Sequence, residues 1–327
     1  YAYQKMSALA VYWACFGSSG HVAEPEGLVT ENYRMRPPLD FADNHHVKSI
    51  VLGRQRANLD NQRFIGSSGW RQNEQTFDGA TVTLPLGSAI DLHYAGFYNV
   101  NRVYGPSNGS QRAEWHGPVH ALYADLRWNA IGTFMPYVYS MDFHNSAAQS
   151  NRTAGIAFKR TWTLGSGWSM PVRLDWAEQN DAGDNPTSYS AHYSNLEAAL
   201  VHGPVRWQIG RETLGGDATR SNHRFQTPLA TLHIFDGWVD KFLTTPSQGV
   251  EDTYVSLSAK WPRVSAQVSW HDLRAAAVTR HYGDEIDGSL TLPLVKGQEL
   301  LVKGGRYRAA DYGTSTTKLW LQWQATF

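Results

Sequence analysis

Histidines and acidic residues are the side chains of this sequence best suited to catalysis or metal binding, but they occur in no spacing typical of an enzyme. The chain contains 13 histidines, yet it has no H-E-x-x-H zinc motif and no G-x-S-x-G nucleophile motif, since residues 66–69 read GSSG. Asp181, Asp184 and Asn185 lie in a glycine-containing stretch without EF-hand spacing, which favours a plain turn. We therefore predict no enzyme activity, no metal site and no cofactor.

Charged side chains instead recur at every second position of many partly apolar runs. Residues two apart fall on one face of a strand, and rings of charge facing a pore can select ions. On this basis we predict the following pore-lining residues: Asp91, Asp125, Arg127, Asp142, Lys159, Arg173, Asp175, Glu197, Arg206, Asp252, Lys260 and Lys318. The signs are mixed, so an alternative is that acids and bases on adjacent strands simply neutralise each other.

The strand period is clearest in residues 317–327, which read TKLWLQWQATF. The odd positions are apolar and the even positions are mostly polar, with Trp320 as the exception. About ten alternating residues suffice to cross a bilayer as a tilted strand, with aromatic residues at the interface. The aromatic residue Phe327 at the end of this run favours a membrane strand over a strand of a soluble sheet.

Similar runs recur from Val47 onward, and the connections between them alternate between short and long. Short turns such as 85–88 alternate with long links such as 58–75, 105–117 and 215–249. This pattern is typical of outer-membrane barrels, whose turns are short on one side and whose loops are long on the other. A soluble sandwich or propeller would bury its apolar faces and has no reason to place all the long links at one end.

The sequence therefore predicts an all-β fold, an antiparallel transmembrane β-barrel of about 14 strands in residues 47–327, or 16 if the N-terminal segment contributes. An even number lets the strand at Val47 pair with the terminal strand and close the barrel. In the run 133–143 we expect Tyr137, Tyr139, Met141 and Phe143 to face lipid, opposite Ser140 and Asp142.

Composition agrees with this fold and excludes several classes of protein. The 29 basic and 29 acidic residues balance, so no global field attracts nucleic acid. A single cysteine, Cys15, excludes an intramolecular disulfide framework. A mean hydropathy of -0.44 does not argue against a membrane barrel, because half of each strand faces water.

Residues 1–46 show no clear organisation. Lys5 is followed by MSALAVYWACFG, which could be the apolar part of a signal peptide, although a strand or buried segment is the plainer interpretation. Residues 33–46 show no strand period, and we leave this segment unplaced.

Two of the long connections resemble segments of a known family. Residues 53–56, 58–64 and 69–77 read GRQR, NLDNQRF and GWRQNEQTF, and residues 225–231, 237–238 and 240–243 read FQTPLAT, GW and DKFL. Both regions resemble bacterial outer-membrane porins of the alginate export family. The resemblance covers residues 53–327 and implies a passive channel in the outer membrane of a Gram-negative bacterium. The sequence before Val47 does not look like this family's first strands, so alginate does not follow as the solute.

The longest connection, 215–249, is too apolar to extend into water. We expect it to fold into the barrel and constrict the pore through Phe225, Trp238, Asp240 and Lys241; a packed cap over the rim is the alternative. The predicted function is passive diffusion or export of small polar or anionic solutes such as sugars or uronates. The expected partners are that solute, outer-membrane lipid and lipopolysaccharide. A barrel hydrolase and a soluble carbohydrate-binding β protein are the competing hypotheses.

Overall fold

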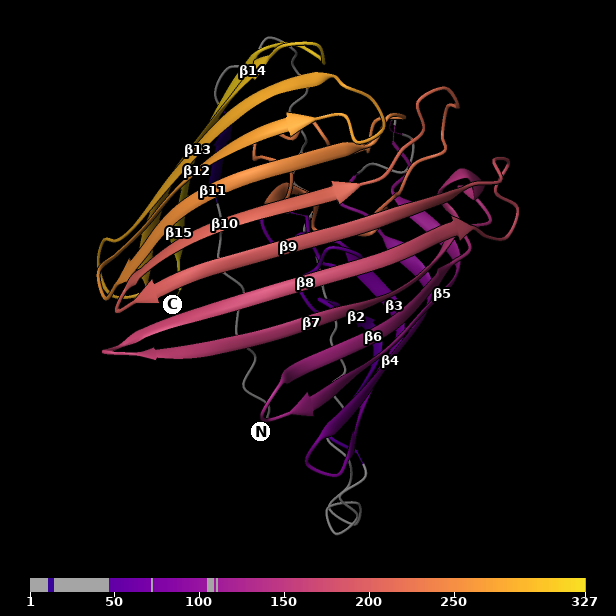
Figure 1. Ribbon diagram of the computed structural model, residues 1–327, viewed down its shortest axis with the longest axis horizontal. Coiled ribbons are helices and arrows are strands. Elements are labelled where there is room, and N and C mark those ends of the chain that lie inside the picture. The colour runs from indigo at the N-terminus through magenta and orange to yellow at the C-terminus, as the bar shows by residue number, and fades with distance from the viewer. Residues whose placement is uncertain (1–10, 15–46, 72, 105–108, 110, 327) are drawn as a thin grey trace.

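The computed structural model describes residues 11–14, 47–71, 73–104, 109 and 111–326, and their strands form one antiparallel sheet (Figure 1). The strands are β1 (Val11–Ala14), β2 (Ser49–Gln55), β3 (Thr76–Leu86), β4 (Ile90–Asn101), β5 (Glu114–Trp128), β6 (Gly132–Met141), β7 (Asn151–Gly165), β8 (Trp168–Asp181), β9 (Ser190–His202), β10 (Val205–Leu214), β11 (Val250–Trp261), β12 (Val264–Arg274), β13 (His281–Pro293), β14 (Gln298–Ala309) and β15 (Thr316–Ala325). From β2 to β15 these are the fourteen strands that the sequence predicts after Val47.

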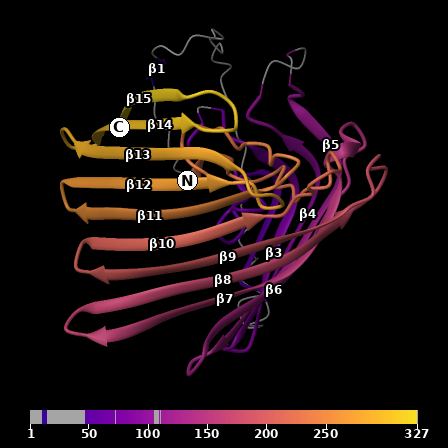
Figure 2. The same cartoon turned by 45° about the horizontal axis from the view of Figure 1, so that its top comes forward.

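From β2 to β15, neighbours in the sheet are neighbours in the chain, and the sheet curls into the wall of a barrel (Figure 2). The expected pairing of the first strand after Val47 with the terminal strand is wrong for the described residues. The edge of β15 that does not face β14 pairs with β1 instead, with Val11 opposite Trp323. Strand β2 pairs with β3 alone. Because β1 occupies the edge of β15, that edge is not available to β2. The remaining residues up to 46, and Phe327, lie outside the described residues.

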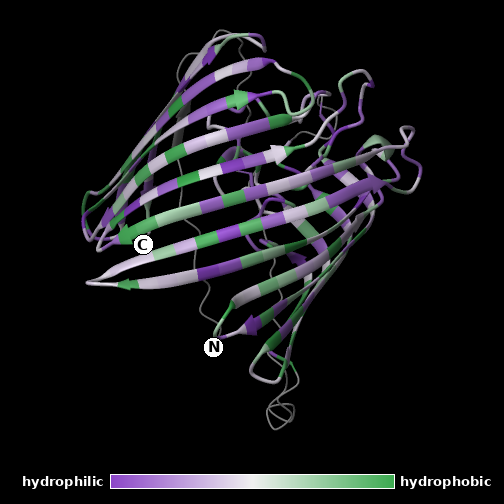
Figure 3. Cartoon of the chain, viewed as in Figure 1, coloured by the Kyte–Doolittle hydropathy of each residue, from purple (hydrophilic) through white to green (hydrophobic). Residues whose placement is uncertain are grey.

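The outer face of the sheet is apolar and exposed, and hydropathy alternates along the strands (Figure 3). On β10, for example, Ile209 is 56% exposed while Glu212 is buried. The large exposed side chains of this face include Leu122, Ile156, Leu174, Trp176, Leu196, Trp207, Val255, Trp270, Ile286 and Leu319. A soluble fold would cover such a surface, whereas a membrane barrel presents it to lipid.

Strand β6 reverses the orientation that its sequence predicts. Val138 is 46% exposed, whereas the four side chains expected to face lipid are each 3% exposed or less and so point inward: Tyr137, Tyr139, Met141 and Phe143. The interior beside β6 is filled with protein, since the ring of Phe64 lies 5.3 Å from that of Tyr137. Alternation alone identifies two faces but not which of them meets lipid, because an inner face packed against an inserted segment is also apolar.

The connections divide between the two ends of the barrel as expected. Short turns, with a positive backbone φ at Gly87 and Gly203, join β3 to β4 and β9 to β10. The long connections all lie at the other end, and two of them contain single-turn 3-10 helices, Ala147–Gln149 and Leu232–Ile234. In the described part of the chain, no helix is long and apolar enough to cross a membrane.

Candidate functional site: two loops inside the barrel

Two long connections lie inside the curved sheet and bind to each other (Figure 2). We call residues 56–71 with 73–75 the first inner loop and residues 215–249 the second inner loop. Ile65 and Leu229 form a parallel bridge, and Thr231 donates its amide N–H to Gln62 at 3.1 Å. A β-carbon on Gly66 would overlap the Thr231 hydroxyl, so the close approach of the loops requires glycine there.

Aromatic side chains pack the joined loops against the barrel wall. Phe64 contacts Tyr139 of β6 at 5.2 Å between ring centroids, Tyr193 of β9 at 5.5 Å, and Phe225 of the second inner loop at 6.0 Å. Phe225, predicted for a constriction, therefore lies buried between loop and wall. Such tilted and edge-on pairs add stabilisation beyond the area that they bury.

A buried arginine connects both loops to the wall. The Arg63 side chain is 1% exposed, and its guanidinium lies 2.9 Å from Glu212 of β10 and 2.9 Å from Asp236 of the second inner loop. The central carbon of the guanidinium, Cζ, also lies 4.5 Å from the centroid of the Phe235 ring. Burial alone would lower the pKa of Arg63, but the two carboxylates hold that pKa above its ordinary value, so the arginine stays charged.

A second cation is enclosed by three tryptophans. Lys303 Nζ of β14 lies 3.7 Å from the ring centroid of Trp238, 4.4 Å from that of Trp70 and 5.6 Å from that of Trp320. It also donates to His233 Nε2 at 2.8 Å. Trp320 is the apolar exception among the polar positions of its strand, and on the inner face it forms one side of the cage around Lys303. The cage attaches both inner loops to β14 and β15 through cation–π contacts.

Carboxylates around this cage fix the second inner loop further. Glu285 and Asp287 of β13 accept the amide N–H groups of Val239 at 2.6 Å and Trp238 at 3.0 Å. Asp240 lies 2.7 Å from His233 Nδ1 and 3.1 Å from Lys318 Nζ.

The other predicted constriction residue, Lys241, lies near the opening. Its Nζ is 5.8 Å from the Tyr307 ring centroid and 3.5 Å from the Thr314 hydroxyl.

On the opposite wall, several predicted pore-lining residues form ion pairs. Asp60 of the first inner loop binds both Lys159 and Arg173, and Arg173 also binds Asp175. Burial alone would raise the pKa of Asp60, but Arg173 and Lys159 lower that pKa below its ordinary value. Asp60 is therefore a carboxylate at neutral pH, and it ties the first inner loop to β7 and β8.

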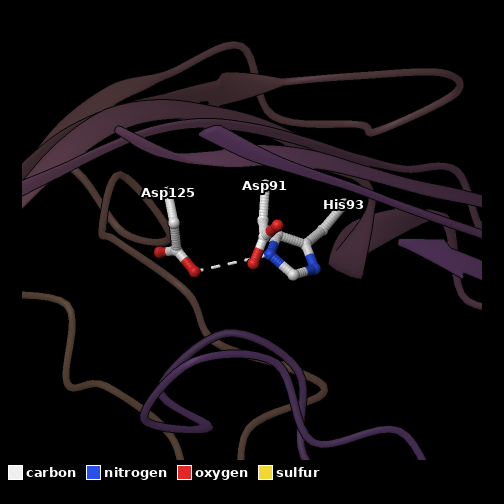
Figure 4. A group of neighbouring side chains, drawn as sticks. All are labelled: Asp91, His93 and Asp125. Carbon is white, nitrogen blue, oxygen red and sulfur yellow. Dashed lines mark ion pairs between the residues drawn. The ribbon is translucent and has the colours of Figure 1, made fainter. Parts of the chain in front are cut away.

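A related group lies nearer the short turns, where Figure 4 shows Asp91, His93 and Asp125 together. His93 Nε2 is 3.4 Å from Asp125, and Asp91 lies 2.9 Å from Lys48 and also binds Arg127. The three side chains could hold a metal by distance. Two basic groups already neutralise Asp91, however, so the ion pairs account for the cluster.

A cavity of about 270 Å³ lies between the second inner loop and β9 to β12. Two further predicted residues, Glu197 and Asp252, line it. Glu197 accepts hydrogen bonds from Asn195 at 3.2 Å and from Gln208, and Asp252 lies 2.8 Å from His271 Nδ1.

The last three predicted pore-lining residues lie at the ends of strands. Arg206 donates to Gln208 at 2.9 Å near the short turns, and Lys260 is exposed there. Asp142 lies just beyond β6, where a β-carbon on Gly183 would overlap its carboxylate. That position places it in the connection rather than on the strand.

Sequence reasoning missed Asp60, Arg63, Glu285, Asp287 and Lys303. The first two lie in a connection, where no periodicity assigns a face. Glu285 and Asp287 flank the exposed Ile286, and this alternation is the signal that could have found them.

Comparisons with known proteins place this fold. No protein-family profile matches the chain, and no curated protein matches it. The structure is similar to OccAB4 of Acinetobacter baumannii, with a TM-score of 0.65 and 12% identity over 85% of this chain and 71% of that one. It is also similar to the outer membrane protein OprD of Pseudomonas aeruginosa, with a TM-score of 0.63 and 12% identity over 85% and 75% of the two chains.

A third similar structure is OpdK of Pseudomonas aeruginosa with vanillate, with a TM-score of 0.62 and 14% identity over 85% of this chain and 74% of that one. At these identities the likeness establishes the fold, which is that of outer-membrane β-barrels of Gram-negative bacteria. The comparisons give no support to the resemblance to the alginate export family.

Proposed function

We propose that this protein is a passive channel for small polar or anionic solutes in the outer membrane of a Gram-negative bacterium. The observation that carries the proposal is the contrast between the two faces of the sheet. The outer face exposes large apolar side chains, whereas the inner face carries ion pairs and two inserted loops. A lipid-facing wall around a charged, narrowed interior is the arrangement of a diffusion pore.

The exposure of the ion pairs favours anions over cations. In the pairs between Lys48 and Asp91, Lys159 and Asp60, and Lys318 and Asp240, the lysine side chains are 61%, 37% and 37% exposed, whereas the carboxylates are 6%, 9% and 8% exposed. Because the acids lie beneath the bases, a passing solute meets ammonium groups first. A carboxylate on a small solute is therefore favoured, and the vanillate bound by the similar OpdK belongs to this chemical class.

We infer that the second inner loop constricts the pore rather than capping its rim. Its contacts with Arg63, Lys303 and Glu285 all involve groups on the inner side of the sheet or on the other inner loop. The segment-level resemblance to the alginate export family covers these same two loops, and membership of that family stays a hypothesis. We expect lipid and lipopolysaccharide to cover the outer face.

Conductance and solute flux test the proposal. Planar bilayers should show discrete channels whose reversal potential in a salt gradient reports anion preference, and liposomes should swell in small sugars and uronates. Replacing residues 225–243 by a short glycine-serine linker should raise single-channel conductance. Unchanged conductance would defeat the constriction, and absence of any channel or swelling from the folded barrel would defeat the transport function.

A further inference from the structure

Two aspartates face each other on the outer surface, close to the end that bears the long connections. Asp272 of β12 and Asp284 of β13 are direct partners across the two strands. They lie two residues from Trp270 and Ile286, which are exposed on the outer face, and so they share that face. Like charges directly opposite each other on a sheet destabilise it unless a cation lies between them.

The ring of His281 completes a group with ligand spacing. His281 Nε2 lies 3.1 Å from Asp272 Oδ1 and 3.7 Å from Asp284 Oδ1. Zinc-ligand bonds of about 2.0 to 2.2 Å place neighbouring ligand atoms of one ion about 3 to 3.5 Å apart. The two distances from His281 are therefore close to those between ligands of one metal ion, and the ligand atoms of all three residues lie within 4.8 Å of one another.

The two closest of these atoms are shielded from solvent but are not hydrogen bonded to each other. Asp272 Oδ1 and His281 Nε2 both lack a hydrogen-bond partner within the described part of the chain. Buried polar atoms without partners are costly, and this cost disappears if both bind an ion placed between them.

The nearby arginines leave the proposed ligand atoms available to bind a metal ion. Arg274 donates to the other oxygen of Asp272 at 2.8 Å, and Arg308 lies opposite Asp284 on β14. The similar group of Asp91, His93 and Asp125 differs because Lys48 and Arg127 both bind Asp91.

We propose that Asp272, His281 and Asp284 bind a divalent transition-metal ion such as Zn²⁺ at the outer rim of the barrel. One imidazole nitrogen and two carboxylate oxygens are ligands that suit this class of ion. Water or the phosphate of a surrounding lipid would occupy the remaining positions. The ion neutralises the facing aspartates and joins the ends of β12 and β13. This site lies outside the pore and does not depend on the proposed transport function.

Zinc titration of the purified barrel tests this inference. The full chain in detergent, freed of its affinity tag and treated with chelator, should bind one Zn²⁺ by isothermal titration calorimetry. The substitutions His281→Gln and Asp284→Asn should each weaken binding by at least about tenfold. His116→Gln is the matched control. His116 lies 3.5 Å from Glu114 but belongs to no such group of three among the described residues, so this variant should bind Zn²⁺ as the parent does.

Copper provides a second readout that does not depend on affinity. Electron paramagnetic resonance of the Cu²⁺-loaded protein should show coupling to one imidazole nitrogen, and this coupling should disappear in His281→Gln. Equal Zn²⁺ binding by the parent and the two rim variants would overturn the site. Binding of Ca²⁺ but not Zn²⁺ would overturn the assignment to transition metals.

Discussion

Replacing Arg63 by methionine should release the inner loops from the barrel wall. The substitution keeps an unbranched side chain but leaves Glu212 and Asp236 without their shared cation, although both are 6% exposed or less. Removing one partner of a buried ion pair costs about 3 to 5 kcal/mol. At about 1.4 kcal/mol per tenfold change, a cost in this range should raise the population of the released loops by roughly two to three and a half orders of magnitude.

The strand ladders do not involve Arg63, so the barrel itself should remain folded. We therefore expect Arg63→Met channels in planar bilayers to show a second, larger conductance level or increased current noise. Because the ion pairs of Arg63 are buried, the difference in conductance between the variant and the parent should persist at high salt, which screens exposed charges.

A triple variant supplies the control. Arg63→Met combined with Glu212→Gln and Asp236→Asn removes the two uncompensated charges, and replacement of a whole buried ionic group is often tolerated. This variant should return towards the single conductance level of the parent. If Arg63→Met has the same level and noise as the parent, then Arg63 does not hold the loops and the reasoning is refuted.

Three further predictions concern the same loops. Lys303→Met should increase current noise, because it removes the cation–π contacts; noise like that of the parent would contradict the cage. Burial lowers the pKa of His233 below its ordinary value, against the opposing effect of its hydrogen-bonded partner Asp240. The contribution of neutral His233 to loop binding is therefore complete above about pH 6.5 and is lost as the pH falls. Noise should therefore increase on acidification, and the reverse trend would exclude this histidine as the cause. Gly66→Ala should separate the loops because its β-carbon overlaps Thr231, at a cost of about 1 to 3 kcal/mol, and thus raise conductance. Gly288→Ala should not, because its β-carbon would make only an ordinary contact with the Gln267 carbonyl oxygen at 3.9 Å.

The sequence by itself determined the architecture. Period-2 alternation and the division between short and long connections predicted the fourteen strands from β2 to β15. These signals are local, since each follows from the two faces of a strand and from the length of a connection, and both can be read without knowing what lies opposite.

The tertiary structure decided what fills the interior. No local pattern indicates that Tyr139 faces inward, because its orientation depends on Phe64, which arrives from a connection 75 positions earlier in the chain. The ion pair of Arg63 with Asp236 likewise joins residues 173 positions apart. Burying a charge is tolerable only when its partners are in place, and these partners come from separate parts of the chain that the curved sheet holds together.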